Sequence, residues 1–479
     1  MIRCRGVAAL LLMFICASAH GQSEAAPGKS PAQRVETRTE QAIAIAGEIW
    51  ALAELGYLET ESSARLQRYL ADAGFDVEAG VAGLPTAFVA SAGRGRPVIG
   101  ILAEFDALPG MAQDAVPSRQ VRAGSRGGHA CGHHLFGVGS ATAAIAVSEW
   151  LESSGTAGTV RLYGTPAEEG GSGKVYMTRA GLFEDVDVVL HWHPDDANDA
   201  SPGTTNANKS GRFRFHGRAA HAASAPERGR SALDGVEAMN YMVNMMREHI
   251  PQESRIHYVI TDGGEAPNIV PENAEVYYYV RHLKPEMVVS LFERVVAAAQ
   301  GAAQGTGTRV EVEVMHGNYP VLPNHELAGL FHEKMRTLGG ISYSPAEFEF
   351  ARTIRTTLLG DLPPLESAAE IRPSIPGHTM GSTDVGDISW KLPTAGFRTA
   401  TWVPGTPAHS WQAVAAGGTS IGHKGMLLAA KVLAEAAAEL YTDPELIDRA
   451  WEEFELRRGD DFKYEALLGE RDPPLDYRQ

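Results

Sequence analysis

Short, largely apolar runs recur between residues 98 and 190 and are separated by longer stretches with helical spacing. The runs at 98–102, 160–163 and 186–190 are apolar along most of their length, and residues 138–151 between them have the composition of a buried helix. Strands that are apolar on both sides are typical of a parallel sheet covered by helices. We therefore expect an α/β fold, with a mostly parallel sheet and helices on both faces. Ligands of such sheets bind beyond the carboxyl ends of the strands.

The pattern changes at about residue 208, where alternating strand-like segments and two helical stretches follow in the order βαββαβ. This order predicts a ferredoxin-like insert that interrupts the first domain. The predicted division is a signal peptide (1–19), a linker (20–35), the first part of the catalytic domain (36–207), the insert (208–320), the second part of the catalytic domain (321–445) and a charged C-terminal tail (446–479).

The first nineteen residues have a basic start, an uncharged apolar run at 6–16 and a small-residue cleavage pattern at 17–19. This is typical of a secretory signal, so we expect an exported protein, periplasmic or secreted, and no membrane association after signal removal. An uncleaved N-terminal anchor is the alternative. Cys4 and Cys16 lie in this segment, so the mature chain would keep only Cys131. A lone thiol in an oxidising compartment suggests burial or metal ligation.

The formal net charge of −17 argues against nucleic acid as a partner, because such a field repels phosphate backbones. An anionic substrate would need local cationic residues.

Two adjacent acids, Glu168 and Glu169, follow an apolar strand and a Thr-Pro turn and enter a glycine-rich loop. One carboxylate of such a pair can bind a metal while its neighbour handles a proton of a metal-bound water. A solvated surface pair is the alternative. A phosphate loop is excluded, since Glu168 stands where its first glycine belongs and Val175 replaces its Ser or Thr.

Cysteine and histidine side chains follow the same pattern of placement after predicted strands. Gly132 allows a tight turn between Cys131 and His133, so both can point into one cavity. His191 and His193 are two residues apart and face the same side of an extended chain. Either histidine could ligate a metal, and one of them could be structural.

Eight ordered motifs resemble the di-metal aminoacylase/carboxypeptidase superfamily of amidohydrolases, and most of all its branch of proteins like the B-type chain of p-aminobenzoyl-glutamate hydrolase. They are GHACGHH (128–134), GTPAEEGG (164–171), WHP (192–194), GRAAH (217–221) with SALD (231–234), REH (247–249), GEAPNIVP (264–271), GSTDV (381–385) and GTPAHS (405–410). The resemblance implies that the insert is a dimerisation domain, which also acts as a lid over the catalytic site.

The resemblance also implies two divalent ions per chain, zinc or manganese. The implied ligands are Cys131, His133, Glu169, His193 and His409. Glu168 would be the general base and acid. His193 is preferred to His191 because the WHP motif contains it, and Asp106 would orient a neighbouring histidine.

Two departures from the family pattern leave roles open. Glu104 replaces a histidine ligand of more distant carboxypeptidases, and His134 stands where relatives have Asp or Asn. In the relatives, a histidine matching His221 reaches the site of the other subunit, and residues matching Asn268 and Arg281 hold the substrate. A homodimer is expected, with a hetero-oligomer containing a related subunit as the alternative.

The predicted function is that of a metal-dependent amidohydrolase acting on N-acyl or N-aroyl amino acids or dipeptide-like small molecules. The alternatives are an amidase with Cys131 as nucleophile, and a metal-binding or peptide-binding homologue without turnover.

Overall fold

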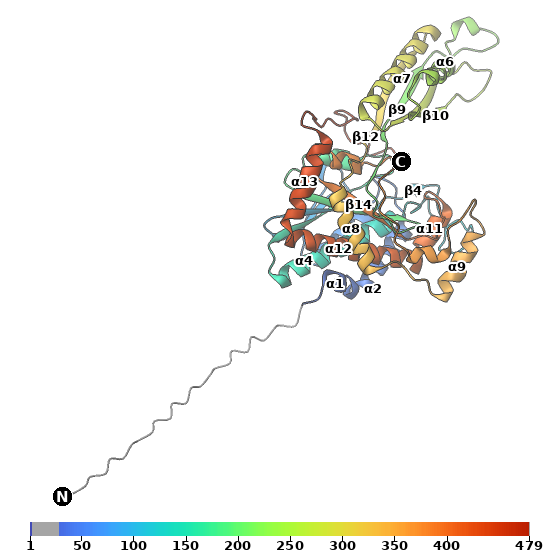
Figure 1. Cartoon of the computed structure of the whole chain (residues 1–479). Coiled ribbons are helices and arrows are strands. Elements are labelled where there is room, and N and C mark those ends of the chain that lie inside the picture. Colours follow the sequence, from blue (N-terminus) through green and yellow to red (C-terminus); the bar gives the residue numbers. More distant parts are fainter. Residues whose placement is uncertain (2–27, 479) are drawn as a thin grey trace.

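The computed structural model describes residue 1 and residues 28–478 and divides them into a large body and a smaller, elongated lid (Figure 1). The predicted signal peptide lies outside the described residues apart from Met1. The predicted linker reaches into them, and its last residues are helical rather than irregular. Ser30 accepts a hydrogen bond from the backbone of Gln33 and Gln33 returns one, so this capping box starts the first helix at Pro31.

The body is built on a six-stranded sheet within residues 76–400, in the order β1-β2-β6-β3-β7-β14. Strands β6, β3, β7 and β14 are parallel, while β2 is antiparallel to β6 and β1 is antiparallel to β2. The strands are β1 (Asp76–Ala79), β2 (Phe88–Arg94), β3 (Val98–Ala103), β6 (Gly158–Gly164), β7 (Val188–Asp195) and β14 (Thr394–Ala400).

Helices of the body come from both sides of the insert in sequence. Helix α4 is almost wholly buried through its first fifteen residues and packs on α12 and on β3, β6 and β7. The helices are α1 (Pro31–Thr37), α2 (Thr39–Leu52), α3 (Thr60–Ala71), α4 (His133–Ser154), α5 (Gly173–Arg179), α8 (His325–Leu338), α9 (Pro345–Arg355), α10 (Val385–Ser389), α11 (Trp411–Gly417), α12 (Ser420–Thr442) and α13 (Pro444–Arg458). Short strand pairs join β4 (Leu108–Pro109) to β5 (Gly127–Gly128) and β8 (Gly203–Thr204) to β13 (Gly377–His378). The expected α/β class with a mostly parallel sheet is confirmed.

The lid has the predicted βαββαβ order and an antiparallel sheet, β10-β11-β9-β12, between residues 207 and 318. Its elements are β9 (Ala207–His216), α6 (Ala232–Met246), β10 (Arg255–Asp262), β11 (Asn273–His282), α7 (Pro285–Thr306) and β12 (Arg309–Asn318). Burial alternates along β11, so Tyr278 packs in the lid's own core with Phe213 while Tyr277 and Tyr279 lie on the open face.

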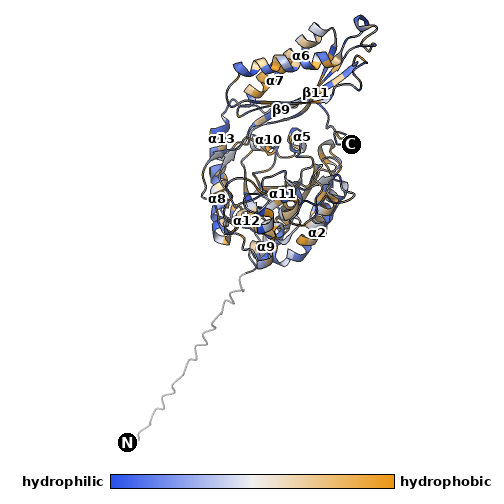
Figure 2. Ribbon diagram, turned by 90° about the vertical axis from the view of Figure 1, so that its right-hand side faces the viewer, coloured by the Kyte–Doolittle hydropathy of each residue, from blue (hydrophilic) through white to orange (hydrophobic). Residues whose placement is uncertain are grey.

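The lid stands on the body through the ends of β9 and β12 that carry Asn208 and Asn318 (Figure 1). Residues 216 and 309 are paired at the opposite end of the lid sheet. A ten-residue strand spans roughly 30 Å, so the two ends of the lid lie far apart. Figure 2 shows the orange, hydrophobic sides of α6 and α7 against the sheet.

The segment predicted as a charged tail has more structure than expected. After α13, residues 459–478 run along the junction between body and lid, where the C-terminus lies in both views (Figures 1 and 2). No helix in the described part of the chain is both long and apolar enough to cross a bilayer.

Candidate metal-dependent active site

One edge of the body sheet collects the candidate site residues. Glu104 and Asp106 follow β3, Glu168 and Glu169 follow β6, His193 lies in the last half of β7, and His409 lies in the loop that follows β14. Because these four strands are parallel, their carboxyl ends meet at the same edge.

The loop that carries Glu168 and Glu169 is held by backbone contacts. The Glu169 N–H donates to Asp106 Oδ2 at 2.9 Å, and the Ala167 N–H donates to Glu59 Oε1 at 2.8 Å. Ala167 has φ +55°, in the left-handed region that L side chains rarely adopt. Such a conformation persists only where its surroundings hold it, and it is common at functional sites.

Cys131 and His133 flank a glycine that the turn requires. Gly132 has φ +76°, and a Cβ at this position would lie 2.7 Å from the Pro194 side chain. His133 is fully buried, and its Nδ1 lies 2.8 Å from Asp106 Oδ1. Nδ1 therefore donates to the carboxylate and Nε2 is left as the ligand atom, which is the usual arrangement behind a metal-binding histidine.

Three overlapping groups of side chains could hold divalent ions. Within each group the ligand atoms lie within 4.8 Å of one another: Cys131, His133 and His193; Cys131, Glu169 and His409; Glu104, His133 and Glu168. The first two groups contain all five ligands implied by the sequence, and they share the Cys131 thiol.

Unpartnered polar atoms support a metal at this place. Glu104 Oε2, His133 Nε2 and Glu169 Oε1 are buried without a hydrogen-bond partner. Such atoms are costly unless a ligand satisfies them. Thiolate, imidazole and carboxylate together suit zinc, and imidazole with carboxylate also accepts manganese. The residues present therefore fit a metal centre.

The histidines are set up as neutral or charged ligands by their surroundings. Burial, together with the nearby His133, lowers the pKa of His193 to about 3, so its imidazole is neutral and able to ligate. Its Nδ1 lies 2.7 Å from the Pro194 carbonyl and its Nε2 lies 3.4 Å from Cys131 Sγ. His409 Nε2 lies 3.3 Å from Glu169 Oε1, and that contact raises the pKa of His409.

Glu168 differs from the other acids of the centre. Burial, followed by the charges of Glu104 and Glu169, raises the pKa of its carboxyl well above the usual range. Such a group can hold a proton near neutral pH and release it again, as a general acid and base must.

His191 lies beside this centre and not in any of the three groups found among the described residues. Its ring packs on Gly396 of β14, where an added Cβ would lie 2.2 Å from the imidazole. Burial and the nearby Lys174 and Arg398 lower its pKa to about 3. The geometry favours His193 as the ligand and a packing role for His191.

A buried ion-pair network beneath the centre was missed by the sequence reasoning. Lys174 has no exposed surface, and its Nζ lies 2.7 Å from both Glu104 Oε1 and Asp384 Oδ1. Lysine is seldom fully buried unless paired, so the surrounding acids hold it there. Asp384 lies in a quoted motif, but only the fold shows that it faces Lys174. His134 Nε2 donates to the Gly417 carbonyl at 3.1 Å, away from the ligand groups.

The three candidates on the lid do not lie together. Arg281 pairs with Asn208 at the body end of the lid, and its guanidinium lies 5.4 Å from the Tyr279 ring centre. His221 and Asn268 lie beyond the far end, where the Ala222 N–H donates to the Asn268 carbonyl at 3.0 Å. Arg281 and Asn268 of one chain therefore do not form a single pocket, which corrects the expectation that they hold the substrate side by side.

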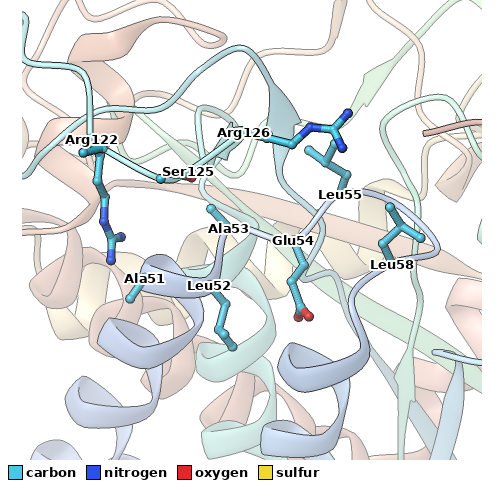
Figure 3. A pocket seen from close by; sticks show the side chains of 11 residues that line it. Ala51, Leu52, Ala53, Glu54, Leu55, Leu58, Arg122, Ser125 and Arg126 are labelled. Carbon is cyan, nitrogen blue, oxygen red and sulfur yellow. The ribbon is translucent and has the colours of Figure 1, made fainter. Parts of the chain in front are cut away.

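A surface cavity of about 410 Å³ lies elsewhere on the body, between residues 51–58 and 122–126. Figure 3 shows Arg122 and Arg126 on its rim and Glu54 beneath. None of its lining residues is a metal-ligand candidate, so it is not part of the centre described above.

Known proteins resemble this chain over most of its length. The sequence model of peptidase family M20/M25/M40 matches residues 100–360. Similar proteins include the B-type chain of p-aminobenzoyl-glutamate hydrolase from Escherichia coli (strain K12), 40% identical over 88% of this chain and 93% of the relative. Xaa-Arg dipeptidase of Mus musculus is 30% identical over 89% and 91%, respectively. A Bacillus subtilis structure described as a dinuclear metal binding peptidase from the M20 family shares the fold with a TM-score of 0.55 and 17% identity, over 85% of this chain and 99% of that one.

Proposed function

Because this chain belongs to peptidase family M20/M25/M40 and is a metal-dependent amidohydrolase, we propose that it cleaves the amide between an acyl or aroyl group and an amino acid. The observation that carries the proposal is Glu168. This carboxylate has a raised pKa and lies among the ligand groups, while its neighbour Glu169 faces His409. A metal carrier without turnover has no need of such a spare carboxylate.

The proposed centre holds two divalent ions, zinc or manganese. Two ligand groups that share Cys131 support this number, as does the fold shared with the dinuclear Bacillus subtilis peptidase. Bound divalent ions supply a water of lowered pKa and polarise the amide carbonyl. Glu168 accepts the proton of the attacking water and then donates it to the leaving amine nitrogen.

Arg281 is the proposed partner of the substrate's free carboxylate. It lies on the open face of the lid sheet at the body end, and its buried Nε has no hydrogen-bond partner. A guanidinium offers a bidentate fork for a carboxylate. The named substrate of the Escherichia coli relative, a p-aminobenzoyl-glutamate, ends in such carboxylates, which supports aroyl amino acids as the substrate class.

A homodimer would complete the site. β10 is an edge strand, and it exposes Tyr258, Val259 and Ile260 next to Tyr241 and Met245 of α6. An exposed apolar edge strand is a liability unless another chain covers it, and an isologous contact of two lids would do so. A related chain in place of the second copy is the alternative, since the Escherichia coli relative is itself one subunit of a hydrolase.

His221 and Asn268 would enter the site of the other subunit. They lie at the far end of the lid, roughly 30 Å from the end that stands on the body of their own chain. The backbone N–H groups of Ala223 and Ser224 donate to His221 Nδ1 at 3.2 Å, so its Nε2 carries the proton and is a donor. Such a donor can stabilise the negative charge that develops on the amide oxygen.

Export to the periplasm or medium is proposed from the signal-like pattern of residues 1–19. Cell fractionation and sequencing of the mature N-terminus would test it. An intact Met1 on cytoplasmic protein would contradict it.

The deciding experiment gives zinc-loaded or manganese-loaded protein a panel of p-aminobenzoyl-glutamate, N-benzoyl and N-acetyl amino acids, and Xaa-Arg dipeptides. We expect release of the free amine from acyl or aroyl amino acids, loss of activity in chelator, and recovery on metal addition. Activity that survives chelation and disappears on alkylation of Cys131 would instead identify a cysteine nucleophile. Tight metal binding without turnover of any substrate would leave a binding protein.

Two variants test the roles within the site. Glu168→Gln should keep the metal content and lose at least about a hundredfold in kcat, because the amide cannot accept the proton. Mixing inactive Glu168→Gln with inactive His221→Ala protein should restore activity, up to about half per heterodimer, because one site then has both residues intact. No recovery despite demonstrated subunit exchange would show that His221 does not cross between chains.

A further inference from the structure

We propose that residues 459–478, here called the arm, belong to the active site and that Arg478 positions the peptide of Glu168 and Glu169. The proposal rests on the proposed function, because it assigns those two acids to catalysis and metal binding. Arg478 is a positioning residue in this account: it touches the backbone of the loop and acts through Glu168 and Glu169.

The end of the arm contacts the catalytic loop directly. Arg478 Nη2 donates to the Glu169 carbonyl at 2.6 Å, and the Tyr477 hydroxyl donates to the same oxygen at 3.3 Å. Arg478 Nη2 also lies 3.9 Å from where a Cβ of Gly170 would stand. A carbonyl that accepts from a guanidinium is fixed more strongly than one that accepts from neutral donors.

Aromatic packing seats the arm under the loop. The Tyr477 ring meets Tyr57 edge to face at 5.7 Å, and the Tyr57 hydroxyl donates to the Gly171 carbonyl at 2.6 Å. Tyr477 also fills the space beside Gly56, where an added Cβ would lie 2.2 Å from its hydroxyl. The two carbonyls that flank Gly170 are therefore held by three side chains, two of which come from the arm.

The rest of the arm is anchored to both the body and the lid. Arg179 of α5 donates to the Gly469 and Arg471 carbonyls at 2.7 and 2.9 Å. Arg471 donates to Glu313 of β12 at 2.9 Å and to the Val314 carbonyl. Leu468 is buried beside Gly317 of β12, where an added Cβ would lie 2.8 Å from its backbone nitrogen. The arm thus joins a strand of the lid to the loop that carries the catalytic acids.

The loop needs such support because its own conformation is strained. Ala167 and Ser172, at its two ends, have φ +55° and +62°. Non-glycine residues in this region cost free energy and persist only where contacts hold them. Removing the contacts made by Arg478 should let the loop relax, and the side chains of Glu168 and Glu169 would move with it.

The variant that tests this is Arg478→Met, which keeps the aliphatic bulk and removes the donors. In the metal-free protein we expect faster hydrogen exchange of the segment 167–173, read by mass spectrometry. In the cobalt-loaded protein the visible absorption should shift, because Glu169 would be displaced from its ligand position. With substrate, kcat should fall at least about tenfold while KM stays within about twofold, as expected for a hydrogen bond from a charged donor that acts on positioning.

Arg478→Lys should recover part of the loss, since it keeps the charge and one donor, and Tyr477→Phe should lose only about threefold. The matched control is Arg449→Met, which removes a surface ion pair between α13 and Glu326. It should change neither the exchange of 167–173 nor the cobalt spectrum. Thermal unfolding of every variant shows whether the fold is kept.

A rise in KM alone, with kcat, exchange and spectrum unchanged, would overturn the proposal and make Arg478 a substrate-binding residue. Unchanged exchange and spectrum in Arg478→Met would overturn it in any case. If the wild-type protein is inactive on the substrate panel but exchange and spectrum change as expected, the proposed function fails and the positioning role stands.

Discussion

Asp106→Asn isolates the contribution of one side chain that serves two ligands at once. Asp106 Oδ1 accepts from His133 Nδ1 at 2.8 Å, and its Oδ2 accepts from the Glu169 N–H at 2.9 Å. An asparagine has one acceptor oxygen and one NH₂ group in the same place. Whichever way it turns, its NH₂ must face a donor, so one of the two hydrogen bonds is lost and replaced by a repulsive contact.

The expected size follows from the kind of bond that is lost. A hydrogen bond to a charged group contributes about 1.5–3 kcal/mol, which corresponds to roughly ten to a hundred and fifty times in an equilibrium constant. Loss of the carboxylate behind a metal-binding histidine typically costs about ten to a hundred times in metal affinity. The two estimates agree, so we expect the metal dissociation constant to rise by about ten to a hundred times.

Competition of the protein with a chelating indicator measures that constant, and kcat at saturating metal separates affinity from chemistry. Asp185→Asn is the matched control, because Asp185 also accepts with both oxygens, from Arg161 at 2.6 and 2.9 Å, but lies away from the ligand groups. The control should leave metal affinity unchanged. Wild-type metal affinity in Asp106→Asn would refute the reasoning that this carboxylate orients His133 and the Glu169 backbone.

Three further substitutions test the centre. His193→Ala should lose a metal ion while His191→Ala keeps both, as elemental analysis after dialysis would show; the opposite result would move the ligand by two residues. Cys131→Ser should weaken metal retention, because a hydroxyl is a poorer ligand than a thiolate; full occupancy would make the thiol structural or nucleophilic. Lys174→Met should lower the free energy of unfolding by about 3–5 kcal/mol in urea titrations, since it leaves the buried Glu104 unpaired, and wild-type stability would show that the network contributes little.

The sequence predicted the parts of the fold that depend on local pattern. Apolar runs identified β3, β6 and β7, and alternation identified the strands of the lid. β2 was not predicted, because residues 88–94 are rich in alanine, serine and glycine and acquire strand structure by pairing with β6. The packed arm was also missed, since its composition is charged and rich in proline and its order comes from contacts with β12 and α5.

The same distinction applies to the site. Residues close to one another in sequence, such as Cys131 with His133, could be grouped from spacing and glycine chemistry. Pairs that are far apart in sequence needed the fold: Lys174 meets Asp384, and Arg478 meets Glu169. The separation of Arg281 from Asn268 likewise follows from strand register, which motif spacing does not reveal.

The role of Glu104, left open by the sequence, is narrowed by its two oxygens. Its Oε1 lies 2.7 Å from the Lys174 ammonium, while its Oε2 lies 3.0 Å from His133 Nε2. Glu104 can therefore offer at most one oxygen to a metal, and its charge is already shared with Lys174. Burial raises the pKa of Glu104, while Lys174 and His133 oppose that rise. Where more distant carboxypeptidases place a neutral histidine, this chain places a carboxylate paired with an ammonium, so the exchange adds little net charge to the centre. On this reasoning Glu104 fixes His133 and limits the negative charge around Glu168 through Lys174, and the five ligands named above hold the metal.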